Sequence, residues 1–162
     1  MKFKLPFEYY TLLSPLSPTE IKERLKGQTS GSFVIDARNT KAYSGHIVNN
    51  AFLISRINNI RGYKKKSMMA IKGRITDIGA GSTISITMTL SPFTYIVIGF
   101  ILLMLIMVTT RNGGLSFDKP VTLFGVVMLP VVFIVLCITF QNDVQKEKPI
   151  LSKLFEGTET DL

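Results

Sequence analysis

The chain has 162 residues, of which 46% are hydrophobic, and it carries a formal net charge of +8 at neutral pH. Its mean hydropathy of +0.31 is high for a chain with this many charged residues. The composition argues against an ordinary water-soluble enzyme, a disordered tail and a disulfide-rich secreted domain. With one cysteine, Cys137, and one histidine, His46, the chain offers no intrachain disulfide and a poor zinc ligand set. We therefore expect neither a metal nor a cofactor.

The first 30 residues predict a strand followed by a short helix. Apolar residues alternate from Phe3 to Tyr9, which predicts a strand, and Pro6 places that strand at a sheet edge. The segment Ser17-Pro18-Thr19-Glu20 matches a capping box with proline at the first helical position. Ile21 and Leu25 then lie four residues apart, so they share one face of the predicted helix.

Period-two alternation dominates the rest of the N-terminal region. The clearest strand is 84–90, where isoleucine, methionine and leucine alternate with hydroxyl residues. Asn49-Asn50 tolerates positive φ and predicts a hairpin between strands near 43–48 and 51–57. Further strands are expected at 33–35 and 71–75. These patterns predict an α+β fold over residues 1–91, a small antiparallel β-meander with one short helix. This region has 14 basic and five acidic residues, a formal charge of +9.

Two long uncharged segments follow this domain. Phe93–Thr110 has 18 residues and Val121–Phe140 has 20 residues. At 1.5 Å per residue they reach roughly 27 and 30 Å, about the hydrocarbon thickness of a bilayer. The link between them contains glycine and proline, so we expect a transmembrane helical hairpin over residues 92–140. Pro130, in the middle of the second segment, is interpreted either as a helix hinge or as a structural kink.

The tail, residues 141–162, predicts a short amphipathic helix from about Pro149 to Glu156. The apolar positions of the tail, Val144, Leu151, Leu154 and Phe155, lie near one helical face. This helix either completes the apolar cover of the sheet or lies at a lipid interface. Five basic residues flank the ends of the hairpin and two lie in its loop, which favours both termini in the cytoplasm. The predicted location is the bacterial inner membrane, with more than one span.

The densest basic segment is Arg56–Lys66, RINNIRGYKKK, which holds five positive charges. Three interpretations stay open: contact with anionic lipid headgroups, binding of a phosphate-bearing ligand, and a solvated loop. The candidate contact residues are Arg56, Arg61, Tyr63, Lys64, Lys65 and Lys66. No catalytic residue is predicted. His46, two residues after Ser44, lies in no nucleophile-elbow pattern and is typical of an ordinary strand residue.

Short motifs spread over residues 11–92 carry a resemblance. They are SPLSPTEI at Ser14–Ile21, YSG at Tyr43–Gly45, FLISR at Phe52–Arg56, and glycine–isoleucine patterns at Gly73–Ile75 and Gly81–Met88. This order resembles a group of small uncharacterised bacterial membrane proteins, which have an N-terminal α+β domain followed by a two-helix transmembrane hairpin. Where that group commonly has YRNSF followed by proline, this chain has RGYKKK. The resemblance implies the same domain order and carries no activity.

Together these features predict an integral membrane protein whose basic cytoplasmic β-rich domain is a non-enzymatic binding or scaffolding module at the bilayer surface. The alternative is an oligomeric, ligand-gated membrane effector or pore with the β domain as its sensor. A membrane-bound hydrolase that uses Ser44 or His46 is a third hypothesis. Expected partners are membrane lipids and either another protein or further copies of the chain. No nucleic acid is expected, because the sequence contains no recognition-helix or RNA-binding strand motif.

Overall fold

The computed structural model describes the backbone of residues 6–31, 41–60, 63–111 and 120–160. Within these ranges it describes all side chains except those of residues 59–60, 63–66, 105, 108–111 and 120–129. The predicted strand at 33–35 lies outside the described residues. The elements are β1 Phe7–Ser14, α1 Pro18–Gln28, β2 Thr29–Ser30, β3 Tyr43–Val48, β4 Ala51–Ile60, β5 Tyr63–Lys66, β6 Met69–Asp77, β7 Ser82–Leu90, α2 Pro92–Arg111, α3 Pro120–Leu154 and β8 Thr158–Thr160.

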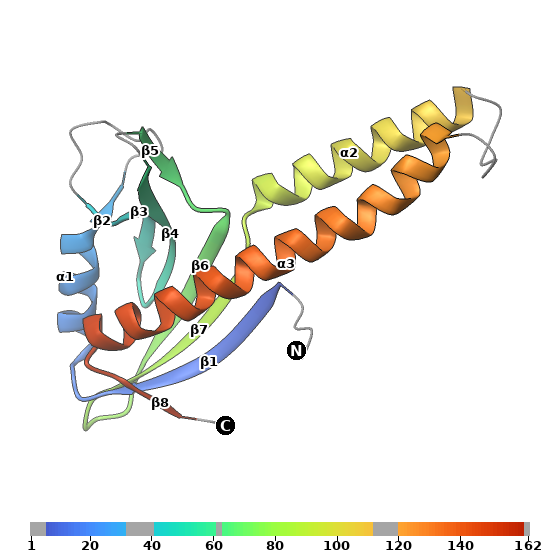
Figure 1. Ribbon diagram of the computed structural model, residues 1–162. Helices are drawn as coiled ribbons and strands as arrows, with labels where there is room; N and C mark the ends of the chain where they lie inside the picture. Colours follow the sequence, from blue (N-terminus) through green and yellow to red (C-terminus); the bar gives the residue numbers. More distant parts are fainter. Residues whose placement is uncertain (1–5, 32–40, 61–62, 112–119, 161–162) are drawn as a thin grey trace.

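The strands form one mixed sheet in an α+β fold (Figure 1). Their order is β2-β3-β4-β6-β7-β1-β8, and β5 pairs with β4 outside this path. β2 is parallel to β3, and the other described strand pairs are antiparallel. The predicted antiparallel meander is therefore wrong in two respects, because β2 runs parallel and β1 lies between β7 and β8 instead of at an edge. The cause is long-range: β1 pairs with β7 along its whole length, from Phe7 opposite Thr89 to Ser14 opposite Ser82.

The start of α1, its buried face and the turn between β3 and β4 agree with the sequence prediction. Ser17 accepts a hydrogen bond from the backbone N–H of Glu20 at 3.3 Å, and the Glu20 carboxylate accepts one from the Ser17 N–H at 2.8 Å. This confirms the capping box. Ile21 and Leu25 are fully buried, so they fix α1 to the sheet. Asn49 has a φ of 53°, which permits the predicted tight turn between β3 and β4.

One face of the sheet, here called the inner face, carries the hydrophobic core. Ile84, Ile86 and Met88 on β7 are fully buried, and the hydroxyl residues between them point to the opposite face. The second half of α3 covers the inner face, and its Val144 and Leu151 belong to the same core. Strands that alternate apolar and polar residues need cover on one face only, so one layer of helices, α1 and α3, is enough to bury the apolar face.

The C-terminal helix differs from the sequence prediction. Instead of a separate helix that begins at Pro149, residues 149–154 are the end of the 35-residue helix α3, with Pro149 inside it. Val144 and Leu151 are buried on either side of the proline. These contacts hold both parts of the helix on the sheet, which outweighs the hydrogen bond that proline cannot donate.

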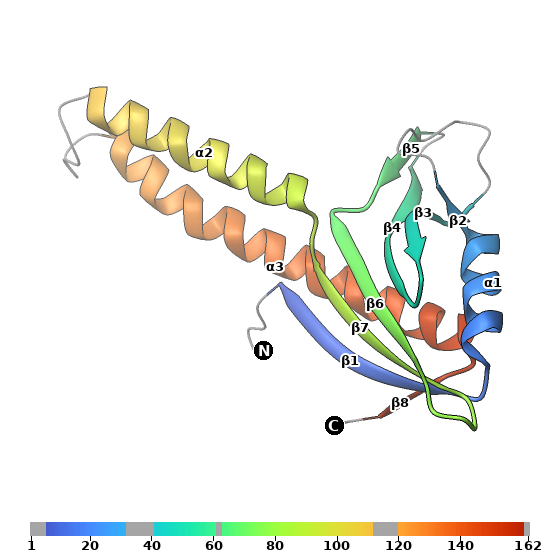
Figure 2. The same cartoon turned by 180° about the vertical axis from the view of Figure 1, so that it is seen from behind.

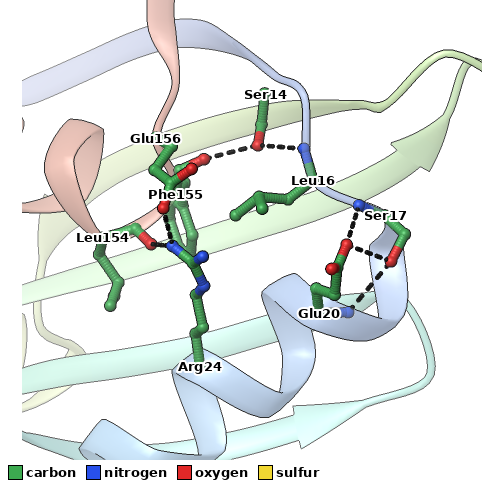
Figure 3. Close-up of polar contacts among 8 residues, drawn as sticks. All are labelled: Ser14, Leu16, Ser17, Glu20, Arg24, Leu154, Phe155 and Glu156. Atoms are coloured by element: carbon green, nitrogen blue, oxygen red, sulfur yellow. Dashed lines mark hydrogen bonds and ion pairs between the residues drawn. The ribbon is translucent and has the colours of Figure 1, made fainter.

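Polar contacts tie the end of α3 to the first strand and helix (Figure 3). The Ser14 hydroxyl donates a hydrogen bond to the carbonyl oxygen of Phe155 at 2.5 Å. Arg24 of α1 forms an ion pair with Glu156 at 2.6 Å and also donates to the Leu154 carbonyl at 3.4 Å. Segments from the two ends of the sequence are thereby joined at one corner of the sheet.

Away from the sheet, α2 and the first half of α3 run side by side and project outward (Figures 1 and 2). We call α2 together with residues 120–139 of α3 the arm. Over the described residues, no helix is long and apolar enough to cross a membrane.

This finding corrects four linked predictions. They are the transmembrane hairpin over 93–110 and 121–140, the integral membrane function, the multi-pass placement in the bacterial inner membrane with both termini cytoplasmic, and the membrane-effector or pore alternative. The sequence argument counted charges along whole segments. In the structure the second segment is continuous with the charged, sheet-packed half of α3, so the two segments are not a separate hairpin unit.

Candidate functional site

The arm exposes large apolar side chains around much of α2, and four of them form a row along the helix. Ile96, Phe100, Leu103 and Met107 are 68%, 60%, 55% and 60% exposed. Their spacing of four, three and four residues puts them on one side of the helix. Such a row is the pattern by which one helix packs into another, with side chains inserted between those of the facing helix. This row is therefore a candidate helix-docking surface.

A second row of the same kind lies on α3. Val131, Val135 and Ile138 are 46%, 55% and 49% exposed, again at spacings of four and three residues. We call these seven side chains of α2 and α3 the seam residues. Large apolar side chains exposed on two neighbouring helices are the kind of surface that marks an interaction site in a folded protein. Sequence reasoning identified both segments as apolar, but it did not separate the exposed positions from those that face the neighbouring helix.

Pro130 lies where α2 and α3 face each other. It lines an apolar cavity of about 320 Å³ together with Ile98, Ile101 and Phe133. A proline removes one backbone hydrogen bond from a helix, yet α3 continues through this position without an end. The two interpretations of Pro130, hinge and structural kink, stay predictions.

At the base of the arm, a buried carboxylate joins α3 to the sheet. Glu147 is 2% exposed. It accepts a hydrogen bond from the Tyr43 hydroxyl at 3.0 Å and forms a short ion pair with the Arg56 guanidinium. The hydrogen bond to Glu147 raises the pKa of Arg56, and burial followed by the Glu147 charge raises the pKa of Tyr43. At neutral pH Arg56 therefore carries its charge and Tyr43 keeps its proton. Their contacts with Glu147 fix the direction in which α3 leaves the sheet.

Arg56 is the one predicted contact residue whose side chain the structure describes. It lines a polar cavity of about 760 Å³ beside Asn58, Asp143 and Lys146. Its guanidinium is engaged with Glu147 and is about one-third exposed, so its main contact is within the fold. The other predicted contacts, Arg61, Tyr63, Lys64, Lys65 and Lys66, lie outside the described side chains, and their role stays a prediction.

A second ion cluster ties α3 to β1 and β8, at the other edge of the sheet from β3 and β4. Lys148 forms ion pairs at 2.8 Å with both Glu8 of β1 and Glu159 of β8. Its ammonium group also lies 4.6 Å from the ring centre of Tyr10, a cation–π distance. The two clusters lie on consecutive residues of α3, so that helix is held to β3 and β4 on one side and to β1 and β8 on the other.

His46 lies on β3 and lines a surface groove described below. In the described ranges, no three His, Cys, Asp or Glu side chains are grouped so that they could hold a metal ion. Comparison of the chain with protein-family models, curated proteins and solved structures finds no match. The functional argument therefore rests on the exposed surfaces of this fold.

Proposed function

We propose that this chain is a non-enzymatic assembly module that associates with further copies of itself through the seam residues of its arm. The observation that carries the proposal is the pair of exposed apolar rows on α2 and α3, both at three- and four-residue spacing. This spacing is the one by which helices pack at about +20° in bundles and coiled coils. The occupant that best fits such a surface is another helix with the same spacing.

The chemistry of the arm favours a second copy over an unrelated partner. The seam residues are all uncharged and apolar, so they carry no charge pattern that selects a different chain. A symmetric assembly buries the same surface on every copy at once. The arm also projects away from the sheet, so basic sheet domains can stay apart while the arms meet (Figure 1).

The free energy of association can be estimated from the apolar surface that a dimer buries. Full burial of a large aliphatic or aromatic side chain is worth about 1.5–3 kcal/mol, so each half-exposed seam residue contributes roughly 1 kcal/mol. A dimer that buries all seven seam residues on both copies gains roughly 14 kcal/mol, comparable with the estimated association cost of about 4–15 kcal/mol. Because these terms nearly balance, one charge inserted in the seam is expected to dissociate the assembly.

Sedimentation velocity of the full chain tests the proposal. We expect a discrete oligomer for the natural sequence, and monomers for Phe100→Glu and for Val135→Glu. Ile78→Glu is the matched control, because Ile78 is 49% exposed but lies in the β6–β7 turn, at the end of the sheet away from the arm (Figure 1). The control is expected to stay oligomeric.

Two results would overturn the proposal. One is a monomeric natural chain that instead floats with lipid vesicles, which would make lipid the occupant of the seam. The other is an oligomer that dissociates equally in the Ile78→Glu control, since that would show a general effect of added charge.

A further inference from the structure

The sheet has a second face, here called the outer face, that α1 and α3 do not cover. In Figure 2 the strands β1, β6 and β7 lie in front of α3. Strand register aligns outer-face residues in rows across the sheet. Lys72 on β6 lies opposite Leu53 on β4 and Thr87 on β7, and Arg74 lies opposite Ala51 and Ser85. Two basic side chains are thus flanked by hydroxyl groups on one side.

The fold separates charges between the two faces. Acidic residues on the strands and on α3, such as Glu8, Glu147 and Glu159, are paired with Lys148 or Arg56 on the inner side. The outer-face strand positions that the structure describes contain no Asp or Glu. Within the described part of the chain, the side chains of Lys72 and Arg74 form no hydrogen bond or ion pair. Their charges are therefore available to an anion.

The outer face is hollowed at this position. A cavity of about 410 Å³ is lined by Lys72, Arg74, Ser85 and Thr87, with His46 and Leu53 beside them. His46, Leu53 and Lys72 also line a second cavity of about 740 Å³ that reaches the first turn of α2 at Phe93, Tyr95 and Ile96. The two cavities therefore form one continuous groove. We call it the outer groove, basic at the Arg74 end and apolar at the Phe93 end.

The basic end has the geometry that a phosphate group requires. Lys72 and Arg74 are two residues apart on one strand, so their Cα atoms are separated by roughly 7 Å. The hydroxyl residues opposite them lie on a neighbouring strand about 5 Å away. An arginine fork and a lysine charge, with hydroxyl donors beside them, are the groups that proteins use to hold phosphate oxygens.

We propose that the outer groove binds a phosphate monoester attached to an apolar or aromatic group. The phosphate lies between Lys72 and Arg74 and accepts hydrogen bonds from Ser85 and Thr87. The attached group lies against Leu53 and Phe93, which line the apolar end of the groove. The apolar end of the groove adjoins the arm seam at Ile96, whereas the basic end is lined by no seam residue. The groove lies on the opposite face of the sheet from the Glu147 cluster.

The ligand chemistry has two natural sources, a nucleoside monophosphate and an alkyl phosphate such as a lipid fragment. Titration calorimetry on the full chain at fixed ionic strength distinguishes them, with adenosine monophosphate, hexyl phosphate and inorganic phosphate as probes. We expect at least one of the two esters to bind about tenfold more tightly than inorganic phosphate, because only the ester also contacts the apolar end. The preferred ester identifies the source.

Variants locate the site. Lys72→Gln and Arg74→Gln are each expected to weaken ester binding by about tenfold, the usual effect of losing one charged hydrogen-bond donor. Phe93→Ala is expected to weaken ester binding while leaving inorganic phosphate unchanged. Lys153→Gln is the matched control, because it removes the same charge from the exposed end of α3. It is expected to have no effect beyond nonspecific screening.

Both basic side chains are solvent-exposed, so the variants are expected to fold, and thermal unfolding checks this. Amide shifts of β6 and β7 on adding the ester to the natural chain give a readout that needs no variant. Equal weakening by Lys153→Gln, or no ester that binds better than inorganic phosphate, would overturn the proposal. The effects of Lys72→Gln and Arg74→Gln do not depend on whether the arm forms an oligomer, because no seam residue lines the basic end of the groove.

Discussion

The ion pair at the base of the arm predicts that two substitutions of the same cluster have unequal costs. Glu147 is 2% exposed, whereas the Arg56 side chain is 36% exposed. Arg56→Ala leaves a buried carboxylate with one hydrogen bond, from Tyr43. Glu147→Gln keeps an oxygen for Tyr43 and leaves a guanidinium that water can reach. We therefore expect Arg56→Ala to be the more damaging change.

The magnitudes follow from burial. Removing one partner of a fully buried pair costs about 3–5 kcal/mol, because the remaining charge is uncompensated. The Tyr43 hydrogen bond remains and the adjoining cavity of about 760 Å³ admits water, so we expect about 2–3 kcal/mol for Arg56→Ala. For Glu147→Gln we expect about 1 kcal/mol, since the exposed guanidinium is rehydrated.

Urea unfolding at pH 7 measures both costs from the transition midpoints and slopes. The double variant is expected to cost less than the sum, because each single change already breaks the same pair. Equal costs for the two single variants would refute the reasoning, and so would a larger cost for Glu147→Gln. Either result would mean that the Glu147 carboxylate is well hydrated in the native protein.

Three further outcomes are expected from urea unfolding. Phe155→Ala should cost about 3–5 kcal/mol, because this fully buried ring at the end of α3 packs against the Phe52 ring at a centroid distance of 6.1 Å; a cost below about 1 kcal/mol would contradict the packing. Tyr10→Phe should be neutral or stabilising by up to about 1 kcal/mol, because the buried Tyr10 hydroxyl has no hydrogen-bond partner in the described part of the chain; a clear loss of stability would reveal a partner. Burial raises the pKa of Tyr43 above its unfolded value of about 10. The contribution of Tyr43 to stability is therefore complete below about pH 10, and the free energy of unfolding should fall above it by up to about 1.4 kcal/mol per pH unit. The same slope in Tyr43→Phe would assign the fall to other groups.

Signals confined to a few neighbouring residues were predictable from the sequence. The Ser17 capping box needs contacts only within four residues, and the Asn49-Asn50 turn is set by its own backbone preference. The alternation of β7 likewise separates a buried face from a hydroxyl face without reference to its partners. Local chemistry alone decides these features.

Features that depend on distant partners were not predictable. The place of β1 between β7 and β8 requires pairing across the full length of the sequence. The ion pair of Arg56 with Glu147 joins residues 91 positions apart. The sequence of the basic segment Arg56–Lys66 therefore does not indicate that Arg56 binds a buried carboxylate. Pro149 predicts a helix boundary by itself, but burial on both sides of it keeps α3 continuous.

The outer groove illustrates the same limit. Lys72 and Arg74 alternate with apolar residues on a predicted strand, which indicates only that they share a solvent-facing side. Register with β4 and β7 then places Leu53, Ser85 and Thr87 around them. No sequence spacing contains that information, because Leu53 comes from β4 and the two hydroxyl residues come from β7.

Disulfide cross-linking through the arm tests most directly whether copies of the chain meet at the seam. Cys137 is the only cysteine, so a Cys137→Ala background allows one new thiol to be placed at a chosen position. Mild oxidation is expected to link Phe100→Cys into covalent dimers within minutes, while Ile78→Cys in the same background stays monomeric. Equal cross-linking at the two positions, or none at Phe100→Cys, would contradict the proposed association of the arms.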